Sequence, residues 1–166
     1  MKVLFLDIDG VLNSDDNLQA MYELSSIKDH HILSDQFGNL FDERCVRWLH
    51  WITERTGCKL VISSSWRWSG IDDLRTMWEY RKLPGEIIDI TTLAPKTELL
   101  NKYKNESKSV LRGCEIQEWI DLYKPSRYCI VDDIDEMLRH HNFVKTDARM
   151  GLTFEEAKTI VKILSN

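Results

Sequence analysis

The sequence has few cysteines, no long apolar run and no excess of basic residues. Four cysteines occur in 166 residues and none forms a Cys-x-x-Cys pair, which favours reduced thiols in a cytoplasm over a disulfide scaffold. No apolar run approaches the roughly 20 residues of a membrane span, and Asp7 and Asp9 interrupt the first apolar segment too early for a signal peptide. Acids outnumber bases by 27 to 22, so a long nucleic-acid track is not indicated. We therefore expect a cytoplasmic protein that does not contact a membrane.

Short apolar runs alternate with segments of helical period, and this alternation indicates an α/β fold. The pattern predicts strands at 3–6, 59–62, 86–92, 128–131 and 143–145, and helices at 41–56, 68–82, 112–124 and 153–164. Such an order implies right-handed crossovers and a mostly parallel central sheet flanked by helices, a three-layer Rossmann-like arrangement. Segment 94–109 is polar and has loop character.

The whole chain, residues 1–166, is expected to form one domain. Its length suits a single sizeable core and leaves no room for a second large domain. Residues 14–39 are mixed, polar and too long for an ordinary connection, so they should form a small insertion or lid. No segment is long enough for a large cap.

Two acids at the end of the first predicted strand are the strongest chemical signal. Asp7 and Asp9 precede Gly10, and like charges about 5 Å apart repel by roughly 3 kcal/mol at an effective dielectric of about 20. A calcium loop is excluded because its glycine stands sixth and its glutamate twelfth, whereas Gly10 is fourth here and Leu18 twelfth. A cation or a proton between the acids is one interpretation, and a solvated turn is the other for this stretch alone.

Further polar residues follow other predicted strands. Ser63, Ser64 and Arg67 follow one strand, and Asp132 and Asp133 follow another. Parallel strands place their carboxyl ends at one edge of the sheet, so these groups should meet Asp7 and Asp9 there. Carboxylates are hard ligands suited to Mg²⁺, and a dication beside a guanidinium suits phosphoryl transfer.

These motifs together resemble the haloacid dehalogenase (HAD) superfamily of aspartate-dependent phosphohydrolases. The resemblance spans nearly the whole chain and rests on four elements: Asp7-Ile8-Asp9-Gly10-Val11-Leu12, the strand ending in Ser63, the base Arg112, and Val131-Asp132-Asp133. More narrowly, four further groups resemble the phosphatase-like domains associated with RNA-repair proteins and polynucleotide kinase-phosphatases: Ser64-Ser65-Trp66-Arg67, Arg112-Gly113 with Glu115-Ile116 and Trp119, Asp135 with Met137, and Thr146-Asp147 with Gly151-Leu152-Thr153.

The resemblance implies a role for each acid. Asp7 would attack phosphorus and become a transient aspartyl phosphate. Asp9 would protonate the leaving oxygen and then activate the hydrolytic water. Asp7, Asp9, Asp132 and Asp133 are the implied Mg²⁺ ligands, with Asp9 expected to contribute its backbone carbonyl.

The implied phosphate-binding groups leave alternatives open. Ser63 would hold a phosphoryl oxygen, with Ser64 as the alternative one position later. Arg112 stands where the superfamily usually has lysine, so Lys96 or Lys108 is the alternative base.

Substrate contacts are expected from Ser64, Gly10, Arg67 and Trp66. Trp66 and Trp68 flank Arg67, so they could stack on a base while Arg67 holds a neighbouring phosphate. Plain packing is the alternative for both tryptophans.

The resemblance implies a Mg²⁺-dependent phosphoric monoester hydrolase, with a polynucleotide 3′-phosphate of RNA or DNA as its substrate and a functional association with a repair kinase or ligase. A phosphatase of small metabolites or nucleotides is the alternative within the superfamily. Outside it, a receiver-like phospho-acceptor and a non-catalytic binding module stay open. The oligomeric state is not predicted.

Overall fold

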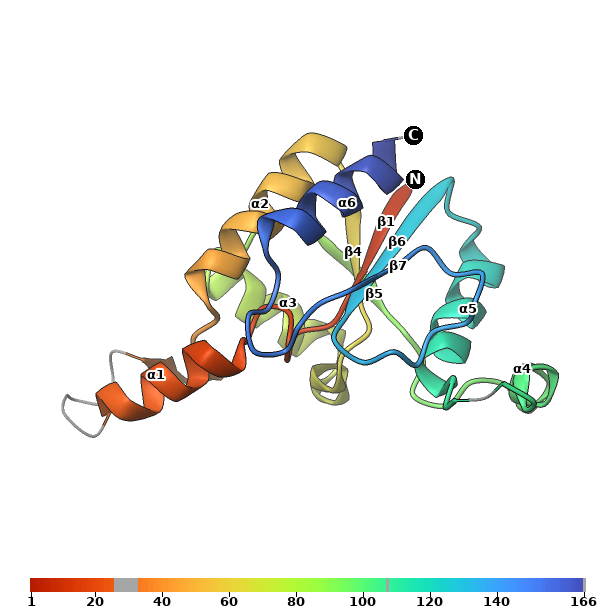
Figure 1. Cartoon of the computed structure of the whole chain (residues 1–166), viewed down its shortest axis with the longest axis horizontal. Coiled ribbons are helices and arrows are strands. Elements are labelled where there is room, and N and C mark those ends of the chain that lie inside the picture. The colour runs from red at the N-terminus through yellow and green to blue at the C-terminus, as the bar shows by residue number, and fades with distance from the viewer. Residues whose placement is uncertain (26–32, 107, 166) are drawn as a thin grey trace.

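A five-stranded parallel sheet forms the centre of the chain (Figure 1). The computed structural model describes residues 1–25, 33–106 and 108–165. Neighbouring strands in the order β5-β4-β1-β6-β7 all pair in parallel. The strands are β1 (Lys2–Leu6), β4 (Lys59–Ile62), β5 (Ile87–Ile90), β6 (Arg127–Asp132) and β7 (Phe143–Lys145).

Helices cover both faces of this sheet. Alternate residues of a strand point to opposite faces, so Leu4 and Leu6 of β1 join the larger core while Val3 and Phe5 join the smaller one. The larger core is closed by α2 (Glu43–Thr56), α3 (Ile71–Tyr80) and α6 (Phe154–Ser165), and the smaller by α5 (Leu111–Tyr123). The short helix α4 (Thr97–Tyr103) packs on α5. The predicted three-layer α/β fold is confirmed.

The strand order creates a switch point next to β1. The chain first adds β4 and β5 on one side of β1, and then crosses to add β6 and β7 on the other. In open α/β sheets, ligands bind where the strand order reverses, outside the carboxyl ends of the strands. Here that place lies between Asp7, which follows β1, and Asp132, which ends β6.

Helix ends that the sequence marks have the expected geometry. Gly57 ends α2 in the left-handed conformation at φ 63°, and its amide donates to the carbonyl oxygen of Thr53 at 2.9 Å. At α6, the Thr153 amide donates to the Glu156 carboxylate at 3.1 Å and the Glu155 amide donates to the Thr153 hydroxyl at 3.3 Å. The predicted capping box is therefore present.

Two predictions of secondary structure need correction. The helix expected at 68–82 is divided into a 3₁₀ helix, Ser65–Ser69, and α3, because Gly70 adopts a φ of 90° between them. Segment 94–109, expected to be a loop, contains α4. This helix is only seven residues long and has no fully buried residue, and its apolar side chains Leu99, Leu100 and Tyr103 are too few to mark a helix in a polar segment.

The expected insertion at 14–39 consists of a helix and a small hairpin. Helix α1 (Asp15–Ser25) and α4 lie beyond the carboxyl ends of the strands, at the lower left and lower right of Figure 1. The hairpin pairs β2 (Ser34–Asp35) with β3 (Gly38–Asn39), while residues 26–32 lie outside the described part. The guanidinium of Arg81 donates to both carboxylate oxygens of Asp35, at 2.9 and 2.7 Å, and anchors the hairpin just beyond the end of α3. None of the described helices has the length and apolarity of a bilayer span.

Candidate active site

The ends of three strands meet at Asp7. The Asp7 amide donates to the carbonyl oxygen of Val131 in β6 at 3.1 Å, and the Ser63 amide donates to the carbonyl oxygen of Leu6 in β1 at 2.9 Å. These bonds extend both ladders past the end of β1. As the parallel pattern predicts, Asp7, Ser63 and Asp132 therefore lie at one edge of the sheet.

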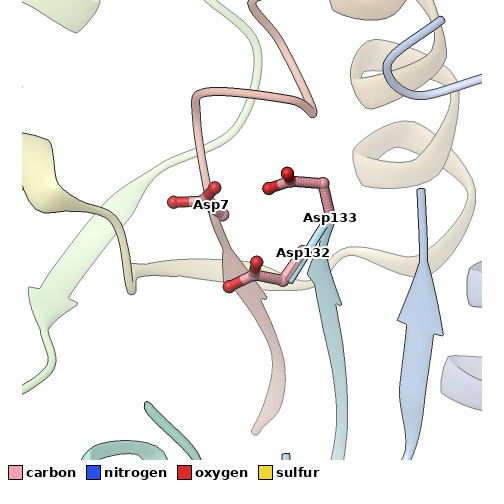
Figure 2. A group of neighbouring side chains, drawn as sticks. All are labelled: Asp7, Asp132 and Asp133. Atoms are coloured by element: carbon pink, nitrogen blue, oxygen red, sulfur yellow. The ribbon is translucent and has the colours of Figure 1, made fainter. Parts of the chain in front are cut away.

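Three carboxyl groups gather at this edge, and we call Asp7, Asp132 and Asp133 the acid trio (Figure 2). One carboxylate oxygen from each lies within 4.8 Å of the other two. Asp7 and Asp132 are buried, while Asp133 is half-buried. The carboxyl groups of Asp132 and Asp133 extend from the end of β6 toward the side on which Asp7 lies.

Gly10 fits the turn after β1 against the trio. Its φ is +75°, and a Cβ at this position would lie 2.5 Å from Cγ of Asp133. Only glycine allows the backbone to approach this carboxyl so closely. The carbonyl oxygen of Gly10 accepts a hydrogen bond from the buried Thr146 hydroxyl at 2.9 Å. The structure thus gives Gly10 a role in shaping the site, and its expected substrate contact stays a prediction.

The acid trio holds protons unusually tightly. Burial raises the pKa of Asp7 from 3.8 to about 6, although the Ser64 hydroxyl and the Arg112 charge oppose this. Burial, and then the charge of Asp7, raise the pKa of Asp132 to about 7, and burial also raises the pKa of Asp133. Carboxylate oxygens are the ligands of hard divalent cations, whose charge would relieve this repulsion. The three residues therefore fit a divalent metal.

Asp9 stands apart from the trio and is exposed. One of its carboxylate oxygens accepts a hydrogen bond from the Asn13 amide at 3.0 Å, and the other accepts from the indole N–H of Trp66 at 2.9 Å. Its carboxylate is therefore not among the trio's ligand atoms but is held beside them in a fixed orientation. An exposed carboxylate can exchange protons with a bound molecule and with solvent.

Arg112 is the base nearest to Asp7 among those considered from the sequence. Its Nη1 lies 3.7 Å from Oδ1 of Asp7. The alternatives are paired with other acids, since Lys96 lies 3.6 Å from Glu118 and Lys108 bonds to Asp135. The start of α5 therefore brings one guanidinium to the trio.

Both candidate hydroxyls are buried at the end of β4. The Ser64 hydroxyl hydrogen-bonds the carboxyl of Asp7. The Ser63 hydroxyl has no hydrogen-bond partner within the described part of the chain. A buried hydroxyl without a partner costs stability, and this leaves Ser63 free to bond an added oxygen.

A comparison of the sequence with protein families agrees with this arrangement of acids, hydroxyls and Arg112. The model for the HAD domain in Swiss Army Knife RNA repair proteins matches residues 3–157. The chain belongs to this family. No curated protein and no solved structure gives a match. Membership supports a HAD-type phosphatase connected with RNA repair, and HAD domains typically use a divalent metal.

A buried ion pair lies behind the acid trio of this HAD domain. Arg67 is 4 % exposed, and its guanidinium donates to Glu115 at 2.6 Å and to the carbonyl oxygen of Ser64 at 2.7 Å. Glu115 also lies 3.6 Å from Nε of Arg112. Burial raises the pKa of Glu115 and lowers that of Arg67, so desolvation outweighs their mutual attraction. The pair links the end of β4 to the start of α5 and supports Arg112.

Arg67 is thus held inside the chain by Glu115 and Ser64, and its expected substrate contact stays a prediction. Sequence spacing alone does not show on which side of a 3₁₀ helix a side chain points. Trp66 is half-buried and donates to Asp9, so its expected stacking on substrate stays a prediction.

The sequence alone assigns no role to two residues of the HAD site, Glu115, which is named there only as part of a motif, and Asn13. Glu115 stands between Cys114 and Ile116, both buried, and an acid in an apolar run is a signal for a buried ion pair. Asn13 orients Asp9 from four positions further along the same turn, and only the folded turn reveals this contact.

Proposed function

We propose that this HAD domain is a Mg²⁺-dependent phosphatase that works through an aspartyl phosphate and acts on polynucleotide ends, such as a 3′-phosphate of RNA or DNA. The observation that carries the proposal is the acid trio at the β1–β6 switch point, with Arg112 3.7 Å from Asp7. When bound at the trio, Mg²⁺ would supply positive charge that offsets the negative charges of the phosphate and of the attacking carboxylate.

Each residue then has a step in the reaction. A carboxylate oxygen of Asp7 forms a bond to phosphorus as the bond to the leaving oxygen breaks, and Asp9 gives that oxygen a proton. Asp9, held by Asn13 and Trp66, next takes a proton from a water molecule whose oxygen attacks the aspartyl phosphate. This step releases phosphate and restores Asp7. Arg112 and the Ser63 hydroxyl would hold the phosphoryl oxygens.

Two supports favour a polymer end over a small metabolite. The family carries the description of an RNA-repair domain. The chain between β1 and α2 adds only α1 and the small hairpin in its described part, so no large cap covers the site in the described residues. An open site leaves room for the rest of a polymer.

The first test is phosphate release from an aryl phosphate with and without Mg²⁺. Replacing the nucleophile, Asp7→Asn, should lower kcat by at least about 1000-fold because the asparagine amide cannot replace the attacking carboxylate. Asp121→Asn, which changes an exposed carboxyl on α5, is the matched control and should retain activity. Undiminished turnover by Asp7→Asn would contradict the proposal.

The second test identifies the substrate. 3′-Phosphorylated RNA and DNA oligomers are compared with nucleotides and sugar phosphates by kcat/KM. We expect the oligomers to be preferred. A clear preference for a nucleotide or a sugar phosphate would replace the polynucleotide assignment with a small-molecule one while leaving the phosphatase chemistry in place.

A further inference from the structure

A cleft of about 550 Å³ is lined by Trp66, the residue whose indole N–H donates to Asp9. Its walls come from the turn of the β2–β3 hairpin, the 3₁₀ helix Ser65–Ser69 and α3. This volume lies in the range of sites that bind small molecules. The residues that matter for its chemistry are Gln36, Phe37, Trp66, Trp68, Ser69 and Asp73.

Trp66 joins this cleft to the proposed catalytic site. Its indole N–H donates to Asp9 at 2.9 Å, while its ring lies against Phe41 in an edge-on contact with centroids 5.6 Å apart. The same side chain lines the cleft. Because both contacts fix the ring, a molecule in the cleft would lie at a defined position relative to Asp9.

Trp68 offers an aromatic surface that packing within the chain does not explain. Of the six tryptophans, all in the described part of the chain, only Trp68 is largely exposed, at 75 %. It lies on the 3₁₀ helix two residues after Trp66 and also lines the cleft. Stacking on an aromatic ring is the commonest way in which proteins hold an unpaired base.

The charge and polarity of the cleft select among the parts of a nucleotide. Asp73 is its one charged lining residue within the described chain, so a phosphate would be repelled there. The Gln36 amide, by contrast, can donate to and accept from the edge of a base, and the Ser69 hydroxyl, which donates to the carbonyl oxygen of Trp66 at 3.0 Å, can still accept. A neutral, planar, hydrogen-bonding group fits these walls better than a phosphate or a purely apolar one.

We propose that this cleft binds the terminal nucleobase of the substrate, stacked on Trp68, while the phosphate of the same nucleotide reaches Asp7. The proposal rests on the proposed function and adds to it a site for the base. It also gives the hairpin a task, since Gln36 and Phe37 form one wall and the Arg81–Asp35 pair fixes that wall.

The test compares two 3′-phosphorylated oligonucleotides that differ only in whether the last nucleotide carries a base or is abasic. The native chain should prefer the base-containing substrate by about 5- to 150-fold in kcat/KM, mainly through KM, which is the range that stacking of one base provides. Trp68→Ala should remove most of this preference, and Trp68→Phe should restore part of it. Tyr123→Ala, which changes a half-exposed aromatic residue on α5, should retain it.

The outcomes separate this proposal from the proposed function. Equal rates on both substrates, or a preference that survives in Trp68→Ala, would overturn the nucleobase site even if phosphate is released. If no phosphate is released from any substrate, the proposed function fails. Fluorescence anisotropy of the two labelled oligonucleotides then decides on the cleft, since tighter binding of the base-containing one must depend on Trp68.

Discussion

Replacing Asp132 with Asn should stabilise the metal-free protein. Asp132 is 2 % exposed, and its pKa is raised from 3.8 to about 7, first by burial and then by the charge of Asp7. Each unit corresponds to about 1.4 kcal/mol, so ionised Asp132 costs the fold up to about 4 kcal/mol. Asparagine has nearly the same shape, can keep the hydrogen bond that Asp132 accepts from the Ile134 amide at 2.8 Å, and carries no charge.

The sign of the pH dependence follows from the direction of the shift. A carboxyl with a higher pKa in the folded than in the unfolded state binds its proton more tightly when folded, so stability is lost as the pH rises from about 4 to about 7. Without divalent metal at about pH 8, Asp132→Asn should raise the free energy of unfolding by about 2–4 kcal/mol. The melting temperature should rise by about 4 °C or more. This difference should shrink as the pH falls toward about 4.

Urea denaturation and thermal unfolding, with a chelator and then with Mg²⁺, measure both effects. Mg²⁺ should stabilise the native chain and have little effect on Asp132→Asn, because the variant lacks one ligand of the trio. Asp135→Asn is the control, since its half-exposed carboxyl pairs with Lys108 and should change stability by less than about 1 kcal/mol. The reasoning is refuted if Asp132→Asn is less stable than the native chain in chelator at about pH 8, or if Mg²⁺ stabilises both equally.

Two further variants test the support behind the trio. Glu115→Gln leaves the guanidinium of Arg67 buried without its counter-charge, so the free energy of unfolding should fall by about 3–5 kcal/mol in urea, and kcat should fall because Arg112 loses a neighbour. An unchanged urea midpoint would mean that the pair is not a support. Gly113→Ala places a Cβ 2.8 Å from the backbone nitrogen of Leu138 and 2.9 Å from the carbonyl oxygen of Glu136, so overpacking should cost about 1–3 kcal/mol. Calorimetry measures this loss, and a variant as stable as the native chain would show that the contact relaxes freely.

The regular parts of the fold were predictable because their sequences bury one face. The apolar runs 3–6 in β1 and 129–131 in β6 are almost fully buried, and Thr153 with Glu156 marks the start of α6 by local chemistry alone. Helix α4 has no fully buried residue, and its apolar side chains Leu99, Leu100 and Tyr103 are only partly buried against α5, so the local pattern is weak. The predicted helix at 68–82 includes the last two residues of the 3₁₀ helix because Ile71 and Leu74 have helical spacing, and Gly70 separates the two helices only through its backbone conformation.

The candidate site divides in the same way. Asp7 and Asp132 could be expected together because parallel strands bring their ends to one edge, a property of topology that alternation in sequence already implies. The partners of Asp9 and of Arg112 could not be predicted, because these contacts depend on how a turn and a helix end are oriented. Trp66 contacts Asp9 and Glu115 contacts Arg112 because of the directions in which their side chains point, and the sequence does not give these directions.

The position of β1 in the middle of the sheet has a consequence for how the protein folds. β1 precedes the other strands of the sheet in the sequence, yet its two neighbours are β4 and β6, and β6 follows it by more than 100 residues. Strand pairings between distant segments form slowly, because the entropy cost of closing a long loop comes before the stabilising contacts can form. Asp7 meets Asp132 only once β6 has joined β1, so a growing chain that stops short of β6 has neither the acid trio nor a covered edge on its most buried strand. Metal binding at the trio would therefore report that the last part of the sheet has assembled.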